Sequence, residues 1–146
     1  MRRDKLALYV HLVWATWDRL PNITAEIERR LHRNIESLAQ EMGCTVLAIN
    51  GMPDHVHLFV KLPPTVSVAR LVKQVKGVSS HFVNQTLQPG FLFRWQGRYG
   101  AFSVSRWDVD RIAGYVRRQK EHHGAAAELL SELEETDEEA TIREQA

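Results

Sequence analysis

Segments with the hydrophobic pattern of strands alternate along this chain with segments that have the pattern of helices. The order of these segments is compatible with few folds. Four short segments are rich in β-branched and aromatic side chains, as is typical of strands: residues 7–16, 44–50, 55–62 and 101–105. The tetrapeptide GMPD predicts a short turn between the second and third of these strands. The Pro-Pro pair at 63–64 is expected to end the third.

Three other segments carry apolar residues at helical spacing. In the first, Thr24 is the expected N-cap and Gly43 the expected C-terminal stop. A second helix is expected at about 67–87. The third should be capped by Asp108 and run to about residue 122.

The predicted order is β-α-β-β-α-β followed by a C-terminal helix. This order is typical of an α+β, ferredoxin-like fold, in which an antiparallel sheet carries two helices on one face. With 146 residues, 44% of them hydrophobic, the chain has the length of one compact domain. Because this fold hosts many unrelated activities, it leaves the function open.

Charge is distributed unevenly along the sequence. Residues 124–146 hold eight acidic residues and one arginine, a net charge of −7, whereas residues 1–123 hold 18 basic and 10 acidic residues, a net charge of +8. A basic body is expected to meet a polyanion such as nucleic acid, although an ordinary solvated surface would look the same. We therefore divide the chain into a folded domain at 1–123 and an acidic, helical or disordered tail at 124–146.

Cys44 is the single cysteine, which excludes an intramolecular disulfide. The first residues contain no long apolar run of the kind that a signal peptide or a membrane span requires. We expect a soluble, cytoplasmic protein with no membrane partner.

Two histidines in the third strand are the first candidates for chemistry. Side chains alternate between the faces of a strand, so His55 and His57 point to one side and Val56 to the other. Two imidazoles on a stiff strand are suited to holding a metal ion. The alternative is a pair of histidines on a solvated face.

Tyr115 and Gln119 lie four residues apart in the predicted C-terminal helix, so they project from the same face. Both fall at the border of the apolar stripe and are placed to reach a pocket at the sheet. The alternative for Tyr115 is an amphipathic residue at the edge of the core with its hydroxyl in water.

These features occur together in one family. Five segments between residues 9 and 123, in this order, resemble the single-tyrosine HUH transposases of the smallest bacterial insertion sequences and their REP-associated relatives: YVHLVWATWDR, MPDHVHLFV, VKQVKGVSSHFVN, WQGRYGAFSVS and YVRRQKEHH. The resemblance implies that 1–123 is a HUH transposase catalytic domain. It also implies that His55, His57 and Gln119 bind a divalent metal and that Tyr115 is the nucleophile.

The implied enzyme is a metal-dependent transposase or endonuclease that cleaves and rejoins single-stranded DNA through a covalent 5′-phosphotyrosine intermediate. Two imidazoles and an amide oxygen leave coordination positions for phosphate oxygens, which suits Mg²⁺ or Mn²⁺ better than a closed zinc site. Members of the family typically recognise DNA hairpins and act as homodimers, so hairpin ends and a second copy of the chain are the expected partners.

Further residues are candidates for contacts with DNA. Aromatic rings stack on unpaired bases and guanidinium groups bind phosphates, which singles out Arg94, Trp95, Arg98 and Tyr99. Cations on one face of the second helix are candidates for phosphate contacts: Arg70, Lys73 and Lys76. Packing over the sheet edge and a solvated helix face are the structural alternatives. Tyr99 also competes with Tyr115 as nucleophile but has no polar partner one helical turn away, and His11 is expected to pack rather than to bind metal.

Two other functions stay open at this stage. One is a domesticated HUH endonuclease that nicks hairpins without mobilising an element. The other is a non-catalytic, ferredoxin-like nucleic-acid-binding module, which has no use for Tyr115 and Gln119 together.

Overall fold

A four-stranded antiparallel sheet forms the centre of the computed structural model, which describes residues 4–122. Its strands are β1 (Tyr9–Ala15), β2 (Thr45–Met52), β3 (His55–Lys61) and β4 (Gly100–Val104). They are arranged in the order β2-β3-β1-β4, and each neighbouring pair is antiparallel. This order confirms the predicted ferredoxin-like topology.

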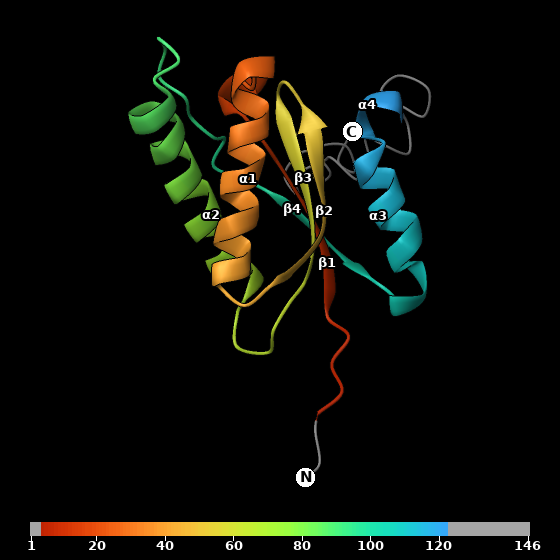
Figure 1. Cartoon of the computed structure of the whole chain (residues 1–146). Coiled ribbons are helices and arrows are strands. Elements are labelled where there is room, and N and C mark those ends of the chain that lie inside the picture. Colours follow the sequence, from red (N-terminus) through yellow and green to blue (C-terminus); the bar gives the residue numbers. More distant parts are fainter. Residues whose placement is uncertain (1–3, 123–146) are drawn as a thin grey trace, which may run out of the picture.

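Helices cover both faces of the sheet (Figure 1). The helices α1 (Ala25–Glu41) and α2 (Val68–Phe82) lie on one face, as predicted. On the other face lie α3 (Val109–Arg117) and the short α4 (Gln119–His122). The C-terminal helices therefore form a separate layer on the other face of the sheet.

Two boundaries differ from the sequence-based prediction. Strand β2 continues to Met52, so the turn to β3 consists of Pro53 and Asp54 alone. The predicted single C-terminal helix is interrupted at Arg118, whose backbone angles (φ −99°, ψ 23°) leave the helical region. Gly43 (φ 91°) follows α1 as predicted. Thr24 and Asp108 stand at the N-cap positions of α1 and α3, as predicted, but neither side chain makes a capping bond, whereas Ser67 caps α2 by accepting a bond from the Arg70 amide.

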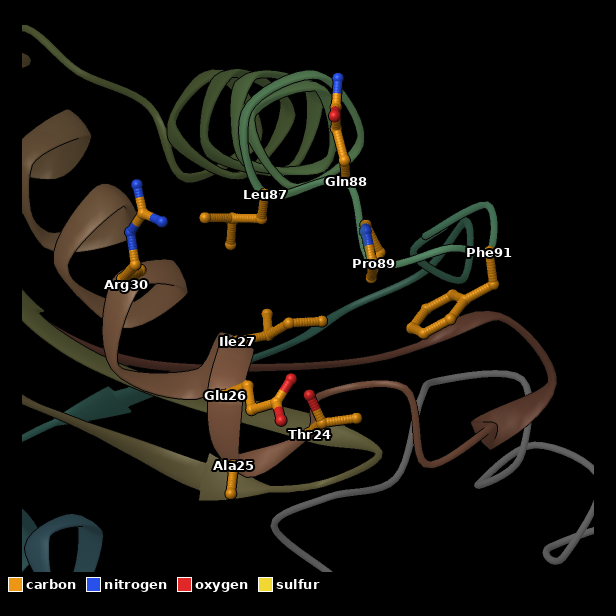
Figure 2. Close-up of a pocket in the computed structure, with 9 residues that line it drawn as sticks. All are labelled: Thr24, Ala25, Glu26, Ile27, Arg30, Leu87, Gln88, Pro89 and Phe91. Carbon is orange, nitrogen blue, oxygen red and sulfur yellow. The ribbon is translucent and has the colours of Figure 1, made fainter.

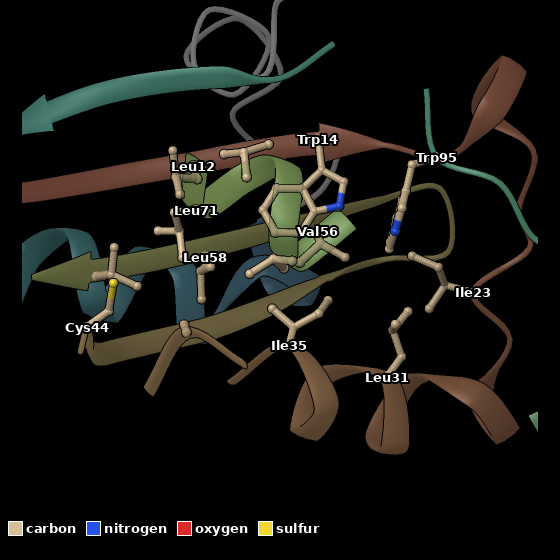
Figure 3. Packing of buried hydrophobic residues seen from close by; sticks show 14 of the residues in the cluster. Leu12, Trp14, Ile23, Leu31, Ile35, Cys44, Val56, Leu58, Leu71 and Trp95 are labelled. Atoms are coloured by element: carbon tan, nitrogen blue, oxygen red, sulfur yellow. The ribbon is translucent and has the colours of Figure 1, made fainter. Parts of the chain in front are cut away.

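The main hydrophobic core lies between the sheet and the α1/α2 layer (Figure 3). The inward side chains of β1 and β3 alternate as a strand requires, with Leu12 and Trp14 from β1 and Val56 and Leu58 from β3. The helices contribute fully enclosed side chains to the same cluster: Leu31, Ile35, Leu71 and Val75. This cluster is the larger of the two in the structure, so it supplies most of the hydrophobic stabilisation.

A smaller cluster lies on the opposite face, under α3. It joins Ala48 of β2 and Phe59 of β3 to Ala113 and Val116 of the helix. Because Phe59 faces α3, the two residues at even spacing before it, His57 and His55, face the same side.

Within the part of the chain that the structure describes, no helix is long and apolar enough to cross a membrane. The predicted acidic tail at 124–146 lies outside the described residues.

Candidate active site

His55 and His57 are enclosed between β3 and the α3 layer. Their exposed fractions are 1% and 0%, and their ring centroids are 5.1 Å apart. The alternation of β3 thus brings both rings to one face, as predicted, and the solvated-face alternative does not apply to them. Burying two imidazoles is costly unless their nitrogens have partners, so the groups around each ring define the site.

His11 is the partner of His57. The register that aligns Val13 of β1 with His57 of β3 places His11 diagonally across the same face. Its Nε2 lies 2.8 Å from His57 Nδ1, and the two rings stack with centroids 5.0 Å apart. His11 is 1% exposed, which agrees with a packing residue that also fixes the orientation of its neighbour.

Asp54 is the partner of His55. One carboxylate oxygen accepts from His55 Nδ1 at 2.7 Å, and the other accepts from Arg19 Nε at 3.1 Å. The hydrogen bond from His55, reinforced by the charge of Arg19, lowers the pKa of Asp54 to about 2 although its partial burial opposes the shift. An ionised carboxylate therefore holds His55 across the ordinary range of pH.

Tyr115 of α3 lies against the histidines. Its ring stands nearly perpendicular to those of His57 and His11, at centroid distances of 6.0 Å and 6.2 Å. Its hydroxyl oxygen is buried. This position differs from the alternative of a core-edge tyrosine with its hydroxyl in water.

Gln119 begins α4, directly after the interruption at Arg118, and its side chain is fully buried. Polar contacts on both sides of it hold the α3–α4 junction to β2. The Asn50 amide donates to the Arg117 carbonyl at 2.8 Å, and Lys120 donates to Asn50 Oδ1 at 2.8 Å. Since Asn50 pairs with His57 in the sheet register, Gln119 is anchored next to the histidine strand.

Lys120 also ties α4 to the first helix. Its ammonium group bonds the Glu28 carboxylate of α1 and, at 3.2 Å, the Gly51 carbonyl of β2. One side chain thus links two helices and the edge strand. Because its charge is already paired with Glu28, Lys120 positions α4 rather than taking part in the reaction.

Few side chains at this site are of the kinds that usually bind metal ions. Within residues 4–122, no three His, Cys, Asp or Glu side chains are arranged to hold a metal ion. Gln119 adds a buried amide oxygen, which is a donor type that hard cations accept. Two imidazoles with one amide oxygen are a set that hard, six-coordinate cations accept when phosphate and water complete the shell.

Two aromatic candidates for DNA contacts lie elsewhere. Trp95 is only 9% exposed, and its ring packs edge-on against Trp14 and Phe93 while its Nε1 donates to Ser79. Its ring is enclosed in the main core, so we withdraw it as a base-stacking residue. Tyr99 packs against the same core, whereas Tyr115 packs with Phe59 in the cluster under α3.

The basic candidates are also divided by the fold. Arg70 and Lys73 are exposed on α2, in the helix layer on the opposite face of the sheet from the histidines. Lys76 donates to the carbonyls of Gln96 and Arg98, and burial lowers its pKa. Lys76 therefore holds the loop before β4 and is withdrawn as a phosphate contact.

Arg94 and Arg98 are exposed on the loop that Lys76 holds. The Arg94 guanidinium lies over the ring of Trp17, 4.5 Å from its centroid. Trp17 and Arg19 are residues that the sequence reasoning missed. The positive φ values of Asp18 and Arg19 next to this tryptophan are visible only in the structure.

Comparisons with known proteins identify the family of the chain. The family model described as "Transposase IS200 like" matches residues 4–119. The ISDra2 transposase TnpA of Deinococcus radiodurans is 29% identical over 119 residues, which cover 77% of this chain and 84% of that protein.

Two solved structures have a similar fold. A crystal structure assigned to a transposase from Deinococcus radiodurans is 27% identical, has a TM-score of 0.61, and is matched over 82% of this chain and 98% of that one. A REP-associated tyrosine transposase bound to a REP hairpin is 16% identical, has a TM-score of 0.63, and is matched over 85% of this chain and 73% of that one. Because the family model spans most of the folded domain, the chain belongs to the IS200-like transposase family and is a DNA transposase.

Proposed function

We propose that this transposase cleaves and rejoins single-stranded DNA with Tyr115 as the nucleophile and with Mg²⁺ or Mn²⁺ bound by His55, His57 and Gln119. The observation that carries the proposal is the position of Tyr115. Its ring packs against His57, and its hydroxyl oxygen is buried on the same face of the sheet as both histidines. A tyrosine with a purely structural role would not have to lie against two buried histidines.

The histidine orientations support the metal assignment. A metal-binding imidazole usually has its second nitrogen fixed by a carboxylate or another acceptor. Here both Nδ1 atoms are held, that of His55 by Asp54 and that of His57 by His11, so we assign Nε2 of each ring to the metal. For Nε2 of His57 to carry a lone pair, its Nδ1 must hold the proton and donate it to His11 Nε2.

Each group of the site then has one task. A bound divalent ion would act as a Lewis acid that polarises the phosphoryl oxygens. The Tyr115 hydroxyl loses its proton as its oxygen attacks the phosphorus, the bond from phosphorus to the 3′ oxygen breaks, and the 3′ oxygen takes up a proton to become a free hydroxyl, so no net proton is consumed. The phosphodiester energy is kept in the new tyrosine link, so rejoining needs no ATP. A phenol has an ordinary pKa of about 10, so its placement by α3 is what makes the attack efficient.

The substrate and the assembly are further parts of the proposal. A site with one nucleophilic tyrosine is suited to cutting one DNA strand at a time. The REP-associated structure with the same fold is bound to a hairpin, which supports hairpin ends as the DNA that this chain recognises. We also propose a homodimer, in which a second copy provides a second tyrosine for strand exchange.

A gel assay tests the nucleophile. Purified protein is incubated with labelled single-stranded hairpin oligonucleotides and Mn²⁺, and a covalent protein–DNA band is sought on a denaturing gel. We expect the band from the wild type and from Tyr99→Phe, but not from Tyr115→Phe or His57→Ala, and we expect EDTA to abolish it. Loss of the metal site or the nucleophile should cost at least about 1,000-fold in rate.

Two outcomes would overturn the assignment. A band that survives in Tyr115→Phe and disappears in Tyr99→Phe would move the chemistry to the opposite face of the sheet. A band that is unchanged by EDTA would remove the metal from the mechanism. Thermal unfolding of each variant serves as the control that its fold is intact.

A further inference from the structure

The end of β1 carries an exposed tryptophan close to the candidate active site. Trp17 is 48% exposed although it is one of the largest apolar side chains of the chain. The next two residues, Asp18 and Arg19, have left-handed backbone angles (φ 53° and 50°). Residues other than glycine adopt this conformation only when their surroundings hold them in it, and such strain is concentrated at functional sites.

The surroundings of this segment are rigid. The Trp17 amide donates to the Arg94 carbonyl at 2.9 Å, and the Thr16 amide donates to the Asp54 carbonyl at 2.9 Å. The Arg19 side chain is held by the Asp54 carboxylate at 3.1 Å. Trp17 is therefore kept at the surface by a fixed backbone rather than by a flexible loop.

A hollow of about 580 Å³ lies next to this tryptophan, lined by Trp17, Asp18, Arg19 and Gln96. Its volume falls in the range of roughly 300–1,000 Å³ that is typical of small-molecule sites. The chemistry of the lining suits an uncharged, flat ligand, since its cation, Arg19, is already paired with Asp54. The Asp18 carboxylate disfavours a phosphate inside the hollow, the indole offers a ring to stack on, and the Gln96 amide is both a donor and an acceptor for a base edge.

The hollow is connected to the candidate metal site through Arg19. This side chain lines the hollow and bonds the Asp54 oxygen opposite the one that holds His55. The Arg94 guanidinium, stacked over the indole at 4.5 Å, supplies positive charge outside the hollow where a DNA backbone would pass. A strand that has its phosphate at the histidines would therefore reach Trp17 within a short distance.

We infer that this hollow binds one unpaired base of the DNA strand beside the cleaved phosphate, stacked on Trp17. The inference rests on the proposed function for its choice of ligand. It assigns to the turn after β1 a nucleotide-binding role, separate from the chemistry of Tyr115.

The chain offers a matched control in Trp107. This residue is 79% exposed and also has an arginine over its ring, Arg106 at 4.3 Å. It follows β4, whose Val104 pairs with Tyr9 at the start of β1, so it lies at the opposite end of that strand from Trp17. Trp107→Ala removes a more exposed indole that also has an arginine stacked on it, and it does not touch the hollow.

The test measures equilibrium binding without metal, so that it does not depend on cleavage. Wild-type protein is first used to select the tightest-binding sequence from a pool of hairpin oligodeoxynucleotides with single-stranded flanks. The selected oligonucleotide is then remade with one abasic nucleotide at each flank position in turn. Affinities for the whole set are compared among wild type, Trp17→Ala, Trp17→Phe and Trp107→Ala.

We expect one flank position at which the abasic change weakens wild-type binding by roughly 5- to 150-fold, the range for the loss of one base–aromatic stack. Trp17→Ala should lose a similar factor on the intact oligonucleotide and should no longer respond to the abasic change at that position. Trp17→Phe should keep part of the affinity, and Trp107→Ala should behave as wild type.

Three results would overturn the inference: no flank position with this effect, an effect that persists undiminished in Trp17→Ala, or an equal loss in Trp107→Ala. None of them depends on a covalent adduct. A chain that forms the Tyr115 adduct but fails this test lacks only the base site, whereas a chain that passes this test without forming an adduct contradicts the proposed function alone.

Discussion

Gly51 of β2 faces Val56 across the hairpin that presents His55, and replacing it with alanine should destabilise the protein for a purely steric reason. A Cβ atom at this position would lie 2.3 Å from the His55 carbonyl oxygen and 3.1 Å from the Val56 Cα. Real Cβ atoms essentially never approach another atom within 3.0 Å. Both neighbours are backbone atoms, so no side-chain rotation can relieve the contact.

The size of the effect follows from this geometry. To reach 3.0 Å, the Cβ and the carbonyl oxygen must separate by about 0.7 Å, which moves β2 away from β3 at the point where their ladder bonds begin. Overpacking of this kind costs roughly 1–3 kcal/mol. Gly51 is not among the residues with positive φ, so alanine fits its backbone angles and the cost is steric alone.

Gly77 provides the matched control. It lies in α2, and a Cβ there would meet nothing within 4 Å. Gly77→Ala should therefore stabilise the helix by roughly 0.5–1 kcal/mol, the usual difference between alanine and glycine in a helix interior.

Urea unfolding measures both changes. With an m-value of roughly 1–3 kcal/mol/M, the midpoint should fall by about 1 M for Gly51→Ala and rise slightly for Gly77→Ala. A Gly51→Ala midpoint equal to or above that of wild type would refute the steric argument. Because the displaced carbonyl belongs to His55, the same variant should also need more Mn²⁺ for adduct formation.

Two further predictions concern the junction of α1 with α4. Burial lowers the pKa of His32 from 6.5 to about 4. As the pH falls, His32 therefore takes up a proton in the unfolded chain before it does so in the folded protein. The contribution of His32 to the free energy of unfolding should be fully present above pH 6.5 and decline by up to roughly 3 kcal/mol between pH 6.5 and 4. Urea midpoints measured across that window should lose this slope in His32→Leu, and an unchanged slope would mean that His32 is not the titrating group. Lys120→Met removes the bonds that hold the start of α4 to Glu28 and Asn50; we expect the Mn²⁺ concentration for half-maximal adduct formation to rise roughly 10- to 100-fold. Lys73→Met, on the exposed face of α2, should leave that concentration unchanged, and an equal rise in both variants would count against a positioning role for Lys120.

The order of strands and helices could be predicted from the sequence because it depends on local periodicity. The ferredoxin-like sheet follows from that order with few alternatives. The shared face of His55 and His57 follows from the two-residue period of a strand, and it needs no knowledge of the partner strands. The start of α2 was readable for the same local reason, since Ser67 bonds an amide three residues away.

The interruption at Arg118 was not predictable from spacing alone. Residues 115–122 have the pattern of a continuous helix, yet the structure ends α3 at Arg117 and restarts at Gln119. Tertiary bonds from Asn50 and Lys120 hold this junction, and no local signal encodes them. The prediction that Tyr115 and Gln119 share one helical face was therefore right about the region and wrong about the continuity of the helix.

By itself, the sequence determined which segments are strands or helices and which face of β3 carries the histidines, because both depend on residues close together in the chain. The tertiary structure alone decided the partners of those histidines. His11 and His57 are 46 positions apart, and they meet only because the β1–β3 register aligns Val13 with His57. The same holds for Trp17 and Arg94, which the pairing of the chain after β1 with the loop before β4 brings together. Contacts between distant residues depend on register and on the packing of layers, and these are properties of the whole fold rather than of any local pattern.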